Sequence, residues 1–239
     1  MKNSIARVFL CILAVMIFVN VNVQASTLNV QTLNVDGEKV TVSVLSDTKD
    51  SKVVQSEDSK AITLTTYDKK NNTINVKQTD KLTKKVTLTD KKVDENKIKS
   101  SANKLNQLKS NSISAASTYL VNSEFSILWD DAYLYYSDKR WAIWNSSNSY
   151  YSTYETSSNS SDLLGFKNSV DSQVGYELAA IASVGTAACA TVVGVLTAPT
   201  GVGAIVGVLV AIGAAISAGV TLWNAYKQRD NADFYWSRV

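Results

Sequence analysis

The chain has 239 residues, a mass of 25.9 kDa and a net charge of +3, and it contains no histidine. This length accommodates one or two domains, and the near-balanced charge argues against nucleic acid as a partner. The lack of histidine excludes Ser-His-Asp and Cys-His nucleophiles and removes the commonest metal ligand. We therefore expect no enzymatic activity, no metal and no other cofactor.

Charge and cysteine are unevenly distributed along the chain. Residues 26–110 carry 16 Lys and 11 acidic residues, a net +5, whereas residues 111–239 carry 6 basic and 10 acidic residues, a net −4. The two halves are thus oppositely charged and suited to associate with each other. Cys11 lies in a leader, and Cys189 lies in an apolar stretch, where we expect a small packing residue. The mature protein would then have no internal disulfide and no cysteine-based metal site.

Residues 1–25 have the features of a secretory signal peptide. Lys2 and Arg7 give a positive start, Val8–Val19 is a short apolar core, and Val23-Gln24-Ala25 places small residues before Ser26. We predict a secreted, extracellular protein; an uncleaved N-terminal anchor is the alternative.

Residues 26–110 begin with period-two alternation, which predicts β-strands. Strands Leu28–Val35 and Lys39–Leu45 flank Asp36-Gly37, a hairpin turn, and a second hairpin joins Ala61–Tyr67 to Thr73–Gln78. Weaker strand candidates are Val53–Gln55 and Lys85–Thr89. The prediction is an antiparallel meander with a lysine-rich face. That face is either a plain solvated surface or a binding surface for an anionic cell surface or for the acidic second half.

A change of period closes this region. Val93–Ser110 places apolar residues on one helical stripe, and the small polar residues 110–117 resemble a linker. A processing point in the linker would make residues 26–110 a propeptide or an inhibitory cap.

Residues 119–170 are rich in Tyr, Trp, Ser and Asn. Short strands are expected at Phe125–Trp129, Ala132–Tyr136 and Trp141–Trp144, followed by a loop over Asn145–Ser161. Such a composition suits either an adaptable contact surface or an ordinary aromatic β core. The pair Asp130-Asp131 is interpreted as a surface turn. Asp162–Glu177 is predicted to be a helix with Ser160 or Ser161 as N-cap.

Residues 178–226 contain no Asp, Glu, Lys or Arg over 49 positions, and seven of the ten glycines lie there. A membrane-spanning helix needs about 20 apolar residues, so the run accommodates two spans, Leu178–Thr197 and Val202–Trp223. Ala-Pro-Thr-Gly (198–201) reads as the turn between them. The predicted fold is therefore α+β, with an N-terminal antiparallel meander, an aromatic-rich middle and a C-terminal apolar helical hairpin.

Small residues recur every fourth position in both spans, which allows close helix packing and membrane insertion of a paired hairpin. In the first span these are Ala182, Thr186, Ala190 and Gly194; in the second, Gly203, Gly207, Ala211, Ala215 and Gly219. Aromatic and basic residues flank the run as interface anchors: Tyr176, Trp223, Tyr226, Lys227, Arg229 and Trp236.

Three interpretations of the hairpin stay open at this point. It inserts into a target membrane after secretion, it anchors the protein on the producing cell, or it is a core pair that never leaves a soluble domain. The low leucine content of the run lowers the free energy gained per residue on membrane insertion, so a core pair within a soluble domain remains an alternative.

The layout resembles a known family. A leader, a Lys/Thr-rich β region, a Tyr/Trp-rich middle and the Gly/Ala hairpin Val174–Tyr226 are similar to the large, unmodified secreted bacteriocins of Gram-positive bacteria, the geobacillin type. The resemblance implies killing of related bacteria through their membrane. The hairpin is also similar in kind to that of pore-forming colicins, but only Val93–Ser110 and Asp162–Glu177 are available as surrounding helices.

The sequence as a whole predicts an antimicrobial, membrane-permeabilising protein. The expected partner is the target-cell membrane, and the hairpin is expected to allow self-association. The sequence does not define a receptor or an immunity protein. A cell-surface-anchored structural or adhesion protein is the alternative.

Overall fold

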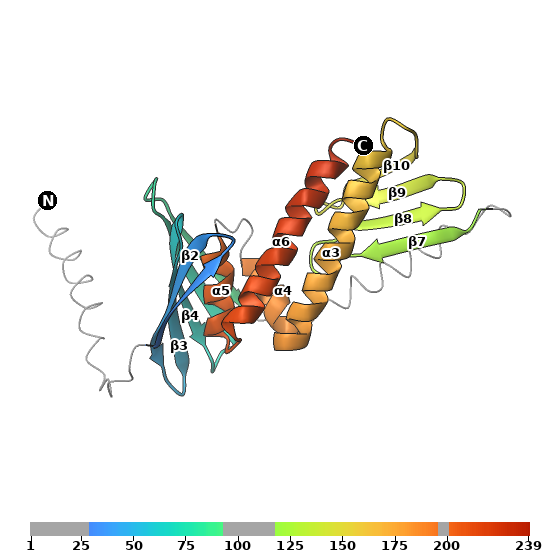
Figure 1. The fold of residues 1–239 in the computed structure, drawn as a ribbon. Coiled ribbons are helices and arrows are strands. Elements are labelled where there is room, and N and C mark those ends of the chain that lie inside the picture. The colour runs from blue at the N-terminus through green and yellow to red at the C-terminus, as the bar shows by residue number, and fades with distance from the viewer. Residues whose placement is uncertain (1–28, 93–117, 196–200) are drawn as a thin grey trace, which may run out of the picture.

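Two antiparallel sheets flank four helices in the computed structural model, which describes residues 29–92, 118–195 and 201–239 (Figure 1). The α+β class predicted from the sequence is confirmed. The leader, the helix Val93–Ser110 and the linker 110–117 lie outside the described residues. Of the predicted turn 198–201, residues 198–200 also lie outside the described residues, and only Gly201 is described.

The first sheet is the predicted meander, with six strands in sequence order. Alternation places Val40 and Val42 of β2 and Val54 of β3 on the buried side, because successive side chains point to opposite faces. Of the weaker candidates, Val53–Gln55 lies in β3 and Lys85–Thr89 overlaps β6, which begins at Val86. The strands are β1 (Asn29–Val35), β2 (Glu38–Asp47), β3 (Ser51–Glu57), β4 (Ala61–Asp68), β5 (Thr73–Asp80) and β6 (Val86–Lys92).

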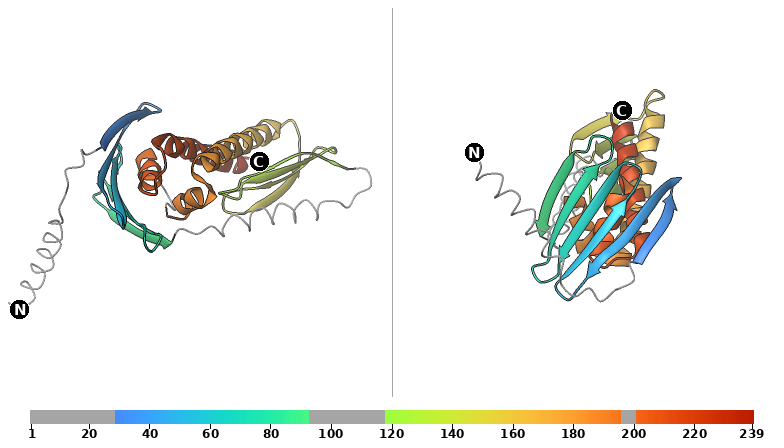
Figure 2. Two further views of the ribbon diagram at one scale, coloured as in Figure 1. Left: turned by 90° about the horizontal axis from the view of Figure 1, so that it is seen from below. Right: turned by 90° about the vertical axis from the view of Figure 1, so that its left-hand side faces the viewer.

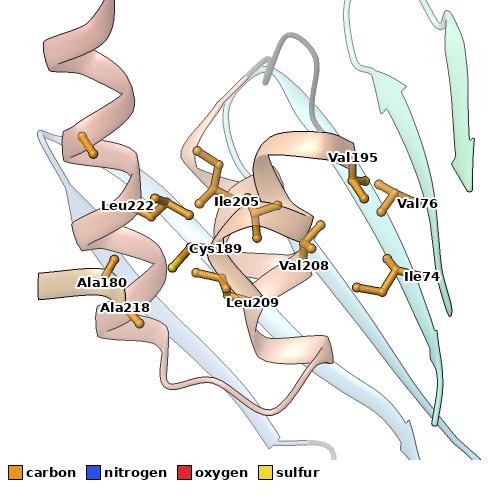
Figure 3. Packing of buried hydrophobic residues seen from close by; sticks show 12 residues of the cluster. Ile74, Val76, Ala180, Cys189, Val195, Ile205, Val208, Leu209, Ala218 and Leu222 are labelled. Carbon is orange, nitrogen blue, oxygen red and sulfur yellow. The ribbon is translucent and has the colours of Figure 1, made fainter. Parts of the chain in front are cut away.

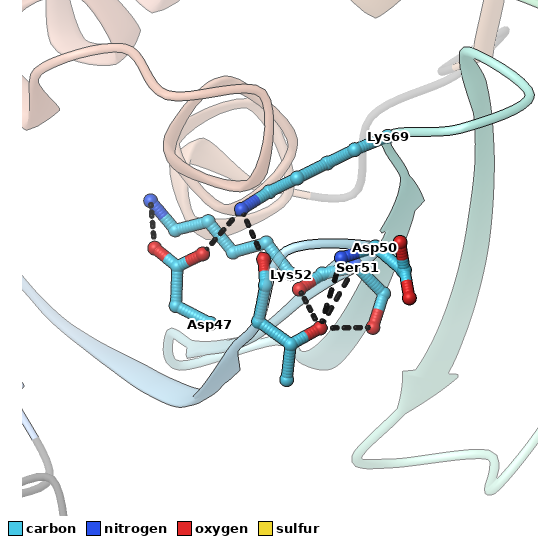
Figure 4. A network of polar contacts seen from close by, with 6 residues as sticks. Asp47, Asp50, Ser51, Lys52 and Lys69 are labelled. Carbon is cyan, nitrogen blue, oxygen red and sulfur yellow. Dashed lines mark hydrogen bonds and ion pairs between the residues drawn. The ribbon is translucent and has the colours of Figure 1, made fainter.

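Polar side chains fix the turns of this sheet. The Asp36-Gly37 turn forms as predicted, with φ of 54° and 82°. At the opposite end, Lys69 Nζ lies 2.6 Å from Asp47 Oδ1 and donates to Thr48 O at 2.6 Å (Figure 4). The hydrogen bond from Lys69 is the largest cause of the lowered pKa of Asp47. The β4–β5 turn is thereby tied to the β2–β3 turn.

The second sheet differs from the prediction in two places. Its order is β10-β9-β8-β7, with strands β7 (Leu120–Phe125), β8 (Ala132–Tyr136), β9 (Arg140–Trp144) and β10 (Tyr150–Tyr154). The strand expected at Phe125–Trp129 is wrong, because its apolar residues Leu128 and Trp129 form a turn that packs against the helices. The loop expected over Asn145–Ser161 contains β10, an edge strand whose exposed tyrosines gave no hydrophobic alternation to detect.

The helices are α3 (Ser160–Val184), α4 (Thr186–Val195), α5 (Val202–Ala211) and α6 (Ile216–Trp236). The predicted helix Asp162–Glu177 is confirmed and extends to Val184, but the N-cap is Asn159, so Ser160 and Ser161 lie inside the helix. The spans Leu178–Thr197 and Val202–Trp223 are not single helices: each is broken, the first at Gly185 and the second around Gly213. Seen from below, the first sheet curves around the helices, and the second sheet lies on their other side (Figure 2).

The core joins both parts of the chain. Ile74 and Val76 of β5 pack with Ile205, Val208 and Leu209 of α5, and α6 adds Ala218, Leu222 and Ala225 (Figure 3). On the second sheet, large side chains meet α3 instead. The buried members there are Tyr133, Trp141, Ile143, Leu163, Phe166, Val170, Val174 and Ala232.

Candidate functional site

The centre of the apolar run, helix α5, lies entirely beneath the six-stranded sheet. All ten of its residues are buried, and none carries a charge. Its N-terminus is held by Asp58 in the β3–β4 turn, where Gly203 N–H donates to Asp58 Oδ2 at 3.0 Å. The other oxygen of Asp58 accepts from Lys60 N and Ala61 N at 2.9 and 2.8 Å. One carboxylate therefore organises a sheet turn and caps the buried helix.

The contact between α5 and the sheet depends on glycine. A Cβ at Gly203 would lie 2.8 Å from Asp58 Oδ2, and one at Gly207 would lie 3.0 Å from Ser56 Cβ. A side chain at either position would require Asp58 or Ser56 to move. The small-residue stripe of α5 thus faces the sheet, whereas the sequence predicted that it would face a second helix.

The sheet face beneath α5 contains hydroxyl groups that lack partners. Ser56 and Thr65 are buried, and among the residues that the structure describes neither side-chain oxygen has a hydrogen-bond partner. A buried hydroxyl without a hydrogen bond costs about 1–3 kcal/mol. The contact between α5 and the sheet is therefore close, but the two buried hydroxyls lower the free energy that it gains.

Two glycines with positive φ divide the apolar run. Gly185 has φ 81° and Gly213 has φ 98°, and a Cβ at either would meet no atom within 4 Å. Helices α3 and α4 meet at a bend of 117°. Within the described ranges, no single helix is both long and apolar enough to cross a bilayer; the bent pair α3–α4 meets the length and composition requirement only when its two arms are taken together.

The remaining predicted packing residues are divided between surface and core. Gly219 of α6 meets α5, because a Cβ there would lie 2.8 Å from Val206 Cα, so one helix–helix contact of the predicted kind exists. Ala190 and Ala211 are buried, Gly194 is half-buried, and Ala182 and Ala215 are exposed. Thr186 opens α4, and its side chain is outside the described part of the structure.

The predicted interface anchors make contacts within the protein. Trp223 stacks on Tyr226, with ring centroids 5.3 Å apart, and the Arg229 guanidinium lies 4.2 Å from the centroid of the Tyr226 ring. Lys227 forms an ion pair of 2.5 Å with Asp36 in the first hairpin turn. Trp236 is half-buried against the second sheet, and Tyr176 is exposed. The ring contacts thus lie within α6, and Lys227 and Trp236 connect this helix to the first and the second sheet.

A buried polar cluster lies where α3 crosses the β7–β8 turn. Glu177 Oε1 accepts from Ser126 Oγ at 2.5 Å, and Glu177 Oε2 accepts from Ile127 N at 2.7 Å. Gln173 Nε2 donates to Ser126 Oγ, Asp131 Oδ2 and Glu177 Oε1 at 2.9, 3.0 and 3.2 Å. Ser126, Asp131, Gln173 and Glu177 all have a relative exposure of 0%.

Burial shifts the acid–base behaviour of this cluster. Desolvation raises the pKa of Glu177 to about 7, against the hydrogen bonds it receives from Ser126 and Ile127. Desolvation also raises the pKa of Asp131 well above its usual range, and the nearby carboxylates of Asp233 and Glu177 add to the shift. The interpretation of Asp130-Asp131 as a surface turn is wrong for Asp131, which points into the protein. The sequence did contain a signal for this burial, because the next residue, Ala132, begins the buried strand β8.

Comparison with known proteins gives no relative. No family model, no curated protein and no solved structure matches this chain. Across the described ranges, no group of three or more His, Cys, Asp or Glu side chains is arranged to hold a metal ion. Cys189 is buried in the core beside α5, as the sequence suggested.

Proposed function

We propose that this protein is a secreted, membrane-permeabilising antimicrobial protein that carries its membrane-active segment in a shielded form. The observation that carries the proposal is α5: a charge-free helix, wholly buried, held to the sheet by glycine contacts over unpartnered hydroxyls. An ordinary core helix would be expected to gain packing from larger side chains at such a contact. A close contact that gains little packing free energy suits a helix that has to leave the sheet during activity.

The breaks in the run support the same proposal. If the chain straightened at Gly213, Val202–Trp223 would form one helix of 22 residues, about 33 Å long, which matches a hydrocarbon core of about 30 Å. Straightening at Gly185 would extend α3 into α4 in the same way. The positive φ values keep both runs short in the shielded form. The β1–β6 sheet then acts as the cap suggested for residues 26–110.

Dye release from liposomes tests the proposal. The protein from Ser26 onward should release dye from vesicles that contain phosphatidylglycerol, because the lysine-rich first half attracts it to an anionic surface. Release should fall as the salt concentration rises. Full solubility without lipid binding or dye release would contradict the proposal.

A reversible lock tests whether the sheet has to leave α5. Ser56→Cys and Gly207→Cys, in a Cys189→Ala background, place two Cβ atoms about 3.0 Å apart. A disulfide prefers a Cβ–Cβ distance of about 3.8 Å, so a shift of less than about 1 Å suffices. We expect the oxidised protein to release no dye and dithiothreitol to restore release.

The control for the lock is a disulfide inside the sheet. Thr66 and Asn75 lie opposite each other on β4 and β5, so Thr66→Cys with Asn75→Cys bridges two strands without touching α5. This protein should release dye in both redox states. Equal release by the oxidised lock and the oxidised control would show that α5 stays under the sheet during activity.

A second candidate, a cell-surface adhesion protein, is favoured by one observation. Four tyrosines of the second half are exposed at or beside the edge strands of the second sheet: Tyr119, Tyr150, Tyr151 and Tyr154. Exposed tyrosine supplies rigid amphipathic contact area. Cell fractionation separates the candidates, since adhesion from the producer requires the protein in its envelope and the antimicrobial function requires it in the medium.

A further inference from the structure

We propose that the β5–β6 hairpin, residues 73–92, is the surface through which the closed protein first binds an anionic lipid bilayer. This inference rests on the proposed function and adds the step that precedes release of α5. It concerns the opposite face of the sheet from the Gly207 contact, formed by different side chains.

The hairpin exposes large apolar side chains that no other part of the described chain covers. Leu82, in the turn, is 91% exposed, and Leu88 and Val86 of β6 are 68% and 47% exposed. Leu88 lies opposite Lys77, which lies opposite the half-buried Leu64 of β4. These side chains share the face of the sheet that points away from α5, because Val76 and Gln78, the neighbours of Lys77, are buried on the other face.

The same hairpin is strongly basic. Residues 73–92 contain six lysines and two aspartates, a net +4. Both aspartates are engaged: Asp80 accepts from Leu82 N and Thr83 N at 2.9 and 2.6 Å, and Asp90 accepts from Asn75 Nδ2 at 3.0 Å. Lys81 pairs with Glu57 at 2.7 Å. The other five lysines are exposed: Lys77, Lys84, Lys85, Lys91 and Lys92.

A lipid bilayer accounts for both features together. Lysines alone on an edge strand are explained by protection of the strand against pairing with other chains. That explanation does not cover Leu82, which lies in the turn beyond the ladder. A leucine at a protruding tip gains free energy by entering an acyl-chain boundary, and each lysine near an anionic leaflet adds attraction.

The first hairpin of the same sheet provides the contrast. Residues 29–47 contain one lysine and three acidic residues, a net −2, and their turn is Asp36-Gly37. This hairpin also exposes apolar side chains, Val30 at 54% and Leu45 at 42%. The first hairpin thus exposes apolar side chains to a smaller extent and has the opposite net charge, which makes it the control hairpin of the same sheet.

Docking through β5–β6 would bring the helices near the bilayer. β6 is an edge strand of the sheet, and α4 contacts it. Because the outer face docks, the sheet lies between α5 and the lipid until α5 leaves its inner face, and α4 is the helix beside the docked edge.

The test uses the oxidised Ser56→Cys/Gly207→Cys lock, so that docking is measured without insertion. Sedimentation with vesicles should show binding to phosphatidylcholine mixed with phosphatidylglycerol and at least about 10-fold weaker binding to phosphatidylcholine alone. Adding Leu82→Ser and Leu88→Ser should weaken binding to the anionic vesicles by about 10–100-fold. Adding Val30→Ser and Leu45→Ser to the lock should leave binding within about twofold.

Two outcomes would overturn the inference: unchanged binding by the Leu82→Ser/Leu88→Ser lock, or equal weakening by both hairpin variants. Its failure is separable from failure of the proposed function. Dye release by the reduced protein with unchanged binding of the hairpin variant would refute docking and retain permeabilisation. Hairpin-dependent binding without any dye release would retain docking and refute permeabilisation.

Discussion

At Gly203 and Gly207 the six-stranded sheet meets α5 through glycine backbone and small polar side chains, beside Val and Ile contacts, whereas the four-stranded sheet meets α3 through large aromatic rings. Trp141, Tyr133 and Phe166 are each at most 1% exposed and fill the second contact. Ser56, Thr65 and Gly207 line the first, with two hydroxyls unpartnered. Aromatic packing gains more free energy per residue than close backbone approach does. Under the proposed release of α5, the first of these contacts is the one expected to separate, and four experiments examine the difference.

The largest effect should come from the aromatic contact. Trp141→Ala removes a fully buried ring that lies 4.4 Å from the Tyr135 ring and should lower the free energy of unfolding by about 3–5 kcal/mol. Hydrogen exchange should accelerate in β8 and β9 more than in β2–β5. Trp144→Ala, on the opposite face of the same strand and half-buried, is the control and should cost less.

The next effect is a pH dependence at the cluster beneath α3. Folding raises the pKa of Glu177 from 4.5 to about 7, so the folded state binds its proton more tightly than the unfolded state does. The stability from this group is therefore complete below pH 4.5 and is lost as the pH rises through 7. Between pH 5 and pH 8 the free energy of unfolding should fall by about 2.5 kcal/mol.

Glu177→Gln should remove most of this decline, because the amide does not titrate; Asp131, shifted in the same direction, would leave a remainder. Denaturant unfolding across the pH range measures it. Glu124→Gln, on β7, should keep the decline of the parent protein. A stability that rises from pH 5 to pH 8 would show that Glu177 is not held in a desolvated site.

A smaller effect is expected at the cap of α5. Asp58→Asn keeps an oxygen for the β3–β4 turn but removes the acceptor for Gly203 N–H, which should cost about 1–2 kcal/mol and increase dye release. Asp68 accepts from Lys70 N and Asn71 N in the β4–β5 turn without capping a helix. Asp68→Asn is thus the matched control. Equal dye release by the two variants would show that the Asp58 cap of α5 does not affect permeabilisation.

The smallest effect should be a gain in stability. Thr65→Val replaces the unpartnered hydroxyl beneath Gly207 with a methyl group and should stabilise the protein by about 1 kcal/mol while slowing dye release. Thr66→Val, one residue on and facing the other side of the sheet, should change neither. A loss of stability in Thr65→Val would mean that the hydroxyl has a partner in solution.

Much of the fold was readable from local pattern. Period-two alternation and Asp36-Gly37 predicted the first hairpin, because the turn chemistry and the strand period are properties of neighbouring residues. The helix after Ser160 was predicted for the same kind of reason. The strand predicted at Phe125–Trp129 was wrong, because Leu128 and Trp129 pack on the helices from a turn and not from a strand.

The candidate site was only half readable. The sequence identified the charge-free run and its small residues, yet it paired helix with helix where the structure pairs Gly203 and Gly207 with the sheet. It also placed Asp131 at the surface. Long-range contacts decided both, because nothing in the neighbourhood of Asp131 or Gly207 encodes the partner at a distance of 42 or about 150 residues.

The sequence by itself determined the strands of the first sheet, the apolar run from Leu178 to Tyr226 and the absence of histidine chemistry. The tertiary structure alone decided that the run breaks at Gly185 and Gly213 and that α5 lies beneath the sheet. The physical reason is that glycine permits a bend but does not require one. A charge-free helix gains by leaving water against any apolar surface, and here the chain itself supplies that surface.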